Sequence, residues 1–249
     1  MAQGRKRKRR RRGVLYAPIA VVLVAITVFF GISVFFRVTE INVSGQERYT
    51  ADQILSASQI TEGDNLLLLD PKEAAKNIMS RLPYVSDVVV EKLIPDKVAI
   101  AVTESRPVAA IQVGAQWWLL DQKGRALEQA GSGDLAGKVR VEGLSPQSVA
   151  AGQAIPVEPK DASKRDALRQ LLQALDREDM VRECEWVDVS NIAALTMRYG
   201  GRFTVVLGKA DDVDKNIARL KGVIAQLEEG DKGRIDLTSD AEARFIPET

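Results

Sequence analysis

The chain begins with a long uncharged segment and continues in short stretches where apolar and polar residues alternate. Residues 14–36 contain no charged side chain. As a helix they extend about 34 Å, at about 1.5 Å per residue, which is enough to cross a hydrocarbon layer of about 30 Å. The segment ends with Phe35 and Phe36 and not with the small residues of a cleavage site. The pattern therefore predicts a single N-terminal transmembrane helix that is not removed.

Residues 37–108 predict a small domain with elements in the order β-α-α-β-β. Apolar and polar residues alternate over 39–43, which predicts the first strand. Thr50 and Gln53 have the spacing of a capping box, which predicts the start of the first helix. The other elements are a second helix beginning at Asp70-Pro71 and two strands at residues 85–92 and 98–102.

Residues 109–240 predict a second domain. Apolar residues recur at helical spacing within 168–175 and within 213–227, which predicts two amphipathic helices. Strands are predicted at 117–120, 139–141, 186–190, 195–199, 203–207 and 233–238, with Gly200-Gly201 as a hairpin and residues 241–249 as a C-terminal tail. The predicted fold class is α+β: one transmembrane helix, the β-α-α-β-β domain, and a mixed, mainly antiparallel β domain with flanking helices.

Charge is distributed unevenly along the chain. The formal net charge is only +1, but a run of eight basic residues precedes the apolar segment. These residues are Arg5, Lys6, Arg7, Lys8, Arg9, Arg10, Arg11 and Arg12. Beside a membrane span such a run is expected to stay in the cytoplasm and to contact anionic headgroups, which places the later domains outside. Nucleic-acid binding is the alternative, although residues 1–13 provide no fold with which to read bases.

Little in the sequence points to catalysis. There is no histidine, which removes the commonest general base and most zinc sites, and the single cysteine, Cys184, cannot form an internal disulfide. Carboxylates cluster at 176–179, 211–212 and 228–229, at the ends or polar faces of predicted helices where they are solvated. Trp117 and Trp118 could bind carbohydrate, but such a pair favours one ring in the core and one against a neighbouring surface. We expect no catalytic residue, metal or cofactor.

A set of short motifs lies between residues 43 and 109. They are Val43-Ser44-Gly45 at a strand end, Tyr49-Thr50 at a helix start, Gly63 to Leu66 in a loop, Pro83-Tyr84-Val85 before a strand, and Glu104 to Ala109 after one. In this order, behind a basic tail and a span, they resemble the FtsQ/DivIB family of bacterial cell-division proteins over residues 5–120. Gln46 departs from the asparagine that is usual there, and the last strand lacks the usual final arginine.

The resemblance implies that residues 37–108 are a POTRA domain and residues 109–240 an FtsQ/DivIB-type β domain. It also implies a non-enzymatic divisome scaffold in the cell membrane at the division septum, with a cytoplasmic N-terminus and an extracytoplasmic C-terminus. The implied partners are FtsB/DivIC-like and FtsL-like bitopic membrane proteins and the septal synthase complex, whose peptidoglycan synthesis the scaffold helps to regulate. The alternatives are a POTRA-type chaperone that delivers polypeptide to a membrane assembly or secretion machine, and a membrane-tethered wall hydrolase.

The last predicted strand is the candidate partner site. A sheet edge can pair its free backbone groups with a strand of another chain. We expect such an edge at Arg234, Ile235, Asp236, Leu237 and Thr238, because only a short tail follows them. The alternative is an ordinary terminal strand that is paired within its own domain.

Overall fold

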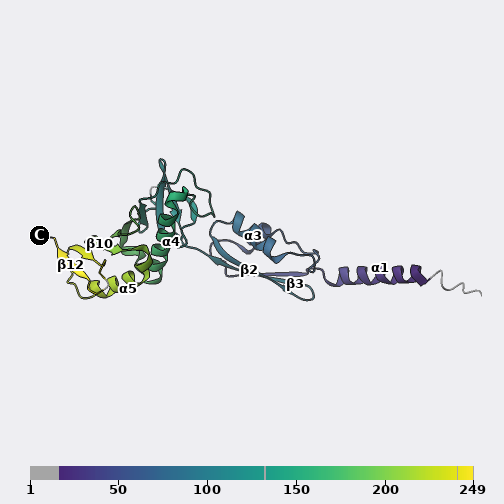
Figure 1. The fold of residues 1–249 in the computed structure, drawn as a ribbon. Helices are drawn as coiled ribbons and strands as arrows, with labels where there is room; N and C mark the ends of the chain where they lie inside the picture. The colour runs from purple at the N-terminus through teal and green to yellow at the C-terminus, as the bar shows by residue number, and fades with distance from the viewer. Residues whose placement is uncertain (1–16, 132, 240, 249) are drawn as a thin grey trace, which may run out of the picture.

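The computed structural model describes residues 17–131, 133–239 and 241–248. These residues form an elongated molecule (Figure 1): helix α1 (Ala17–Phe35) extends from one end, a small domain follows, and a larger β domain carries the C-terminus at the other end. The predicted basic run at 5–12 lies outside the described residues. Over the part of the chain that is described, no helix qualifies as long and apolar enough to cross a membrane. Membrane insertion of residues 14–36 therefore stays a prediction.

The first domain has the predicted order of elements. They are β1 (Glu40–Ser44), α2 (Ala51–Ser58), α3 (Pro71–Arg81), β2 (Val85–Leu93) and β3 (Lys97–Glu104). The sheet has the order β1-β3-β2, with β1 parallel and β2 antiparallel to the central strand. Helices α2 and α3 pack on this sheet, and Ile54, Ile78 and Ile100 are fully buried between the layers.

Both helices begin at the predicted caps. The Thr50 side chain accepts a hydrogen bond from Gln53 N at 3.2 Å, and the Gln53 side chain accepts one from Thr50 N at 2.9 Å. Asp70 Oδ1 accepts from Lys72 N at 2.9 Å, and Pro71 occupies the first turn, where its missing N–H costs nothing. These contacts satisfy backbone donors that an α-helix leaves without partners. They confirm the two predicted helix starts.

The glycine that ends β1 allows two strands to approach closely. Gly45 has a φ of +83°, and a Cβ atom built there would lie 2.1 Å from Val102 O on β3. A side chain at this position would therefore collide with the central strand. This explains the Val-x-Gly motif at the end of the first strand in physical terms.

The second domain is built on one large sheet. Its strands are β4 (Ala109–Val113), β5 (Gln116–Leu120), β6 (Ala126–Ala130), β7 (Val139–Glu142), β8 (Cys184–Asp188), β9 (Leu195–Tyr199), β10 (Phe203–Gly208), β11 (Gly233–Asp236) and β12 (Arg244–Pro247). Their order is β12-β11-β10-β9-β8-β7-β4-β5-β6. Three adjacent pairs, β4–β7, β7–β8 and β10–β11, are parallel and the others are antiparallel. The sheet is thus mixed and mainly antiparallel, as predicted.

Two amphipathic helices cover this sheet. Their bounds are α4 (Ala162–Arg177) and α5 (Val213–Ile224), and three short 3-10 helices lie at Pro159–Asp161, Val181–Glu183 and Ala210–Asp212. The leucines at helical spacing in α4 are buried against alternate residues of the strands, such as Leu195 and Met197 of β9. Apolar residues that recur every 3.6 positions on the helices thus pack against apolar residues that recur every second position on the strands, and together they form one core. Helix α5 ends at Ile224, although the apolar pattern that predicted it runs to Leu227.

Three strands of the second domain were not predicted. Strands β4 and β6 border the predicted strand β5, and β12 lies within residues 241–249, which were expected to be only a tail. Each has four or five residues, so the period-2 pattern is too short to distinguish it from a loop. These segments are strands because of their hydrogen-bonded neighbours in the sheet, and their own sequences do not indicate it.

Candidate partner-binding edge and domain junction

Strand β11, the predicted partner edge, lies inside the sheet. It pairs in parallel with β10, where Val205 faces Ile235, and antiparallel with β12, where Ile246 faces Arg234. The prediction that β11 is a free edge is therefore wrong, because β12 pairs with the side of β11 that was expected to be open. The alternative, a strand paired within its own domain, describes β11 correctly.

The five residues predicted to bind a partner divide between the core and the surface. Ile235 and Leu237 are 0% and 1% exposed and belong to the core of the second domain. Arg234 and Thr238 are exposed, and Asp236 is half-buried. Two of the five side chains therefore hold β11 in place, and three reach the surface. Their partner-binding role stays a prediction.

Strand β12 forms the outer edge of the sheet at this end. Phe245 faces inward and packs edge-to-face on Phe203, with ring centroids 6.1 Å apart. Ile246 is 47% exposed, and Arg244 and Pro247 are exposed beside it. Within the described residues, no strand pairs with the other side of β12. Its outward backbone groups are available to a further strand, except that Pro247 has no N–H to donate.

A glycine holds β12 close to its neighbour. A Cβ atom on Gly233, whose φ is +149°, would lie 2.1 Å from Ile246 O and 2.9 Å from Pro247 Cα. The Glu248 N–H donates to Lys232 O at 2.9 Å just beyond this contact. The open edge therefore depends on the absence of a side chain at residue 233.

The far end of β11 is fixed by a carboxylate. Asp236 Oδ1 accepts from Thr238 Oγ1 at 2.6 Å and from Thr238 N at 3.0 Å. These two hydrogen bonds, first the one from the hydroxyl, lower the pKa of Asp236 below its ordinary value, and the nearby Arg234 and Arg244 act in the same direction. Asp236 and Thr238 are thus joined by two hydrogen bonds at the end of the strand.

The opposite edge of the same sheet is partly covered. At the start of β6, Ala126 N donates to Gln153 O at 2.9 Å and its carbonyl accepts from Gly152 N at 2.7 Å. An isolated bridge joins Arg125 and Ala154 on the same side. The 150–154 loop therefore occupies part of this edge, which leaves β12 as the more open end.

The junction between the two domains contains a small buried apolar cluster. Tyr84 is 4% exposed and packs with Ala110, Leu119 and Leu127 of the second domain. Its neighbour Val85 is fully buried in the core of the first domain. Consecutive residues at the start of β2 thus belong to different cores, as the alternation of a strand allows.

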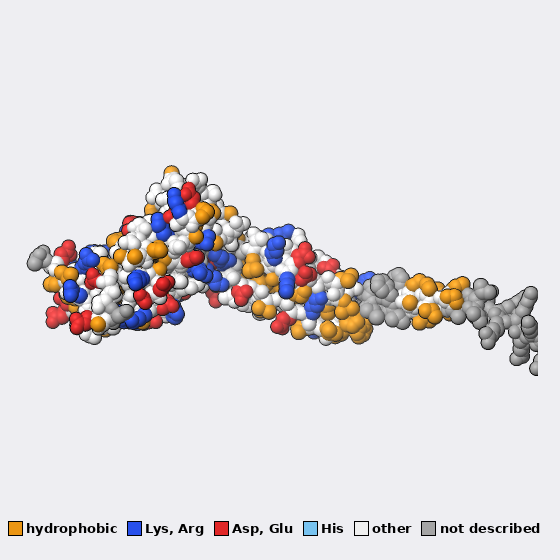
Figure 2. All heavy atoms as spheres, viewed as in Figure 1, with side chains coloured by type: hydrophobic (Ala, Val, Ile, Leu, Met, Phe, Trp, Pro, Cys, Tyr) orange, Lys and Arg blue, Asp and Glu red, His pale blue; other side chains and the backbone are white. Residues whose placement is uncertain are grey.

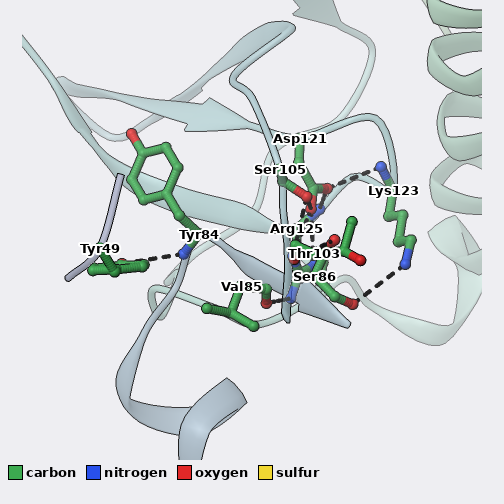
Figure 3. Close-up of polar contacts among 9 residues, drawn as sticks. All are labelled: Tyr49, Tyr84, Val85, Ser86, Thr103, Ser105, Asp121, Lys123 and Arg125. Atoms are coloured by element: carbon green, nitrogen blue, oxygen red, sulfur yellow. Dashed lines mark hydrogen bonds and ion pairs between the residues drawn. The ribbon is translucent and has the colours of Figure 1, made fainter. Parts of the chain in front are cut away.

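A buried ion pair lies beside this apolar contact (Figure 3). Asp121 is fully buried, and its Oδ2 accepts from Arg125 Nε at 2.9 Å and from Ser105 Oγ at 3.1 Å. Arg125 Nη1 donates to Val85 O at 3.0 Å, across the junction, and Lys123 Nζ donates to Ser86 O at 3.4 Å. Side chains from the turn between β5 and β6 therefore hydrogen-bond to the backbone of the first two residues of β2.

A third group of contacts closes the junction on its other side. Arg48 lies over the Tyr84 ring, 3.8 Å from its centroid, and pairs with Glu128 at 3.4 Å. The Tyr84 hydroxyl donates to Glu128, and burial, followed by this hydrogen bond, raises the pKa of Tyr84. Glu104 accepts from the backbone of Arg48 at 2.7 Å. Tyr84 and Glu104, which belong to two of the short sequence motifs between residues 43 and 109, therefore both lie at the junction.

Several of the other residues considered for chemistry have structural contacts. Asp176 pairs with Arg106 at 2.7 Å, and the carbonyls of Glu228 and Glu229 accept from Arg202. Trp117 packs at the junction and Trp118 against the core of the second domain. Cys184 is buried, and burial raises the pKa of its thiol. Among the described residues, no group of three or more Cys, Asp or Glu side chains is placed to hold a metal ion.

Comparison with known proteins agrees with this architecture. Residues 36–105 match the family model described as POTRA domain, FtsQ-type. The cell division protein DivIB of Clostridium tetani is 24% identical over 195 residues, which cover 78% of this chain and 72% of the relative. DivIB of Clostridium acetobutylicum is 25% identical over 205 residues, covering 82% and 80%. The cell division protein FtsQ of Corynebacterium glutamicum is 34% identical over 113 residues, covering 44% and 49%. Residues 36–105 therefore form an FtsQ-type POTRA domain, and the chain is similar over most of its length to cell-division proteins named DivIB and FtsQ.

Proposed function

We propose that this protein is a membrane-anchored, non-enzymatic scaffold of the division septum, which binds FtsB/DivIC-like and FtsL-like bitopic proteins through the edge formed by β12. In this role it helps to regulate septal peptidoglycan synthesis. The FtsQ-type POTRA domain and the similarity to cell-division proteins named DivIB support the role in division. The observation that carries the binding mode is the open outer edge of β12, with Ile246 47% exposed on it. The cell-division relatives favour this function over a polypeptide-handling chaperone.

Anchoring is assigned to the N-terminal helix. Helix α1 contains no charged residue from Ala17 to Phe35 and is about 28 Å long at about 1.5 Å per residue. The basic run at 5–12 would hold the preceding residues in the cytoplasm and place both domains outside. A reporter fused after Thr249 should then be active only outside the cytoplasm. Activity inside the cytoplasm would contradict the proposed topology.

The partner strand would continue the sheet beyond β12. Backbone hydrogen bonds would supply affinity, and alternate side chains would set the register. On the β12 surface, Ile246 offers an apolar contact, and Arg234, which faces it on β11, offers a positive charge. A partner segment with an apolar residue flanked by a carboxylate fits this pattern. Thr238 lies exposed two residues beyond the end of β11.

The test is photocrosslinking in dividing cells of the source bacterium. A photoreactive amino acid at Ile246 should capture a small bitopic membrane protein at the septum. The matched control is Ile192, which is also exposed, at 40% against 47% for Ile246, but lies in the loop between β8 and β9. Capture from residue 192 and not from residue 246 would reject the β12 edge while leaving the division role in place.

A further inference from the structure

Three exposed apolar segments meet at the end of the POTRA domain from which α1 leaves. Leu67 and Leu68 in the loop before α3 are 48% and 83% exposed, and Leu93 and Ile94 at the β2–β3 turn are 44% and 71% exposed. Phe35, the last residue of α1, is 64% exposed. Figure 2 shows apolar side chains gathered at this end of the domain, next to the helix. We call these five residues the apolar collar.

Hydrogen bonds fix the three segments relative to one another. Directly after α1, Phe36 O accepts from Leu66 N at 2.8 Å, and Thr39 N donates to Asp96 O at 2.8 Å. Lys92 Nζ donates to Leu67 O at 3.1 Å and joins the hairpin to the loop. The collar is therefore an ordered surface that is tied to the residues immediately after the helix.

The exposure of the collar is selective. Within the run Leu66 to Leu69, Leu66 is fully buried and Leu69 is half-buried, whereas Leu67 and Leu68 point away from the core. Single exposed apolar side chains are ordinary on a protein surface, but a cluster that surrounds one point marks a contact site. What leaves the domain at that point is an uncharged helix.

We propose that the apolar collar enters the lipid surface around α1 and thereby holds the POTRA domain in a fixed orientation on the membrane. The inference rests on the proposed anchoring through α1. With that helix in the bilayer, the hydrogen bonds to Phe36 and Thr39 bring the collar to the membrane interface. Apolar side chains in such a position bury about 5–10 Å into the boundary between headgroups and acyl chains. Arg37, which is exposed beside them, is placed to contact lipid phosphates.

The experiment uses the full chain in vesicles of phosphatidylethanolamine and phosphatidylglycerol. An environment-sensitive fluorophore is attached to Ile94→Cys in one sample and to Leu68→Cys in another; the native Cys184 is buried and does not compete for the label. Both labels should show blue-shifted emission and be quenched by lipids that carry a quencher on the acyl chain. Val89→Cys is the matched control, because Val89 lies on the same strand as Leu93 and is similarly exposed, at 49% against 44%. Its label should remain in water.

The outcomes separate this proposal from the proposed anchoring. Flotation of the chain with the vesicles reports on α1, and lipid quenching reports on the collar. A chain that floats while the label at residue 94 stays in water would overturn the collar alone, and a chain that does not float would overturn both. A blue shift without lipid quenching, dependent on protein density, would assign the surface to a second copy or another protein and also reject lipid. The variant Leu68→Glu/Ile94→Glu, labelled at Leu93→Cys, should keep its melting temperature and lose the quenching.

Discussion

The POTRA sheet and the sheet of the second domain treat their edges differently. In the POTRA domain the outer strand β2 carries Asp87, Glu91 and Lys92 along its length, and such charges discourage the addition of another strand. Strand β12 carries only one charge over its four residues, and it exposes Ile246 at 47%, as β2 exposes Val89 at 49%. The comparison indicates that charge protects the β2 edge against pairing more than it protects the β12 edge.

Both sheets nevertheless use glycine in the same way. Gly45 brings the end of β1 against β3, and Gly233 brings β11 against β12, each with a hypothetical Cβ atom 2.1 Å from a carbonyl oxygen of the neighbouring strand. In the POTRA domain the close approach is made to the central strand, so it supports the core. In the second domain it is made to the outermost strand, so it supports the candidate binding edge.

The largest expected effect concerns the junction that joins the two domains. Removing one partner of a buried ion pair typically costs about 3–5 kcal/mol, because the other charge is left without compensation. Asp121→Ala, which removes the carboxylate that accepts from Arg125 and Ser105, should lower the free energy of unfolding by about 3 kcal/mol. Denaturant unfolding followed by the fluorescence of Trp117, Trp118 and Trp186 measures this.

A milder variant at the same position is the control. Asp121→Asn retains an oxygen that can accept from Lys123 N and Arg125 N, as Oδ1 does now at 2.9 Å in each case. It removes only the charge that faces the Arg125 guanidinium, so it should cost less than the alanine. Equal losses for both variants would mean that the turn hydrogen bonds, and not the ion pair, hold the junction.

The two glycine contacts give the next largest effects. Alanine at a position with positive φ destabilises by more than about 1 kcal/mol, and at both sites its Cβ atom would also collide with backbone. Gly45→Ala should increase amide hydrogen exchange in β1 and β3, and Gly233→Ala in β11 and β12, each without a comparable change in the other domain. Only Gly233→Ala should reduce partner binding. A loss of binding in Gly45→Ala alone would place the partner on the POTRA domain.

The two domains also differ in how much of their structure the sequence predicts. The POTRA helices begin where Thr50 and Asp70 provide caps, and a cap is a local interaction between residues two or three positions apart. Strand β12 depends on pairing with β11 and on packing of Phe245 against Phe203, which is distant in sequence. No local pattern in a four-residue strand contains that information.

The candidate site was predicted in part for the same reason. The edge predicted at β11 lies one strand inside the true edge, and Ile235 and Leu237, which were expected to bind a partner, lie in the core. Period 2 shows that the two residues share a face and does not show which face is buried. At the junction, Tyr84 could be recognised as part of a family motif, whereas its packing against Leu119 and Leu127 required the folded structure.

A charge on the open edge should separate binding from stability. Ile246→Lys leaves the β12 backbone unchanged and places an ammonium group on the edge with which a partner strand would pair. Because surface substitutions usually stay within about 0.5 kcal/mol, the melting temperature should change little while affinity for the bitopic partner falls. Val89→Lys on the POTRA sheet is the matched control, and it should bind normally. Normal binding by Ile246→Lys would remove the distinction between the two sheets.

The smallest expected effect is the pH dependence of the end of β11. The pKa of Asp236 is lowered in the folded protein, chiefly by the hydrogen bond from the Thr238 hydroxyl, relative to an ordinary value of 3.8. A carboxylate with a depressed pKa contributes its full stabilisation above the unfolded pKa and loses it as the pH falls through the folded value. The contribution of Asp236 should therefore be complete near neutral pH and decline only below about pH 4. Asp236→Asn keeps an oxygen that can accept from Thr238 but does not titrate, so the wild-type advantage over it should shrink on acidification. A constant difference between the two proteins, measured by hydrogen exchange of β11 and β12, would show that the charge of Asp236 does not stabilise the edge.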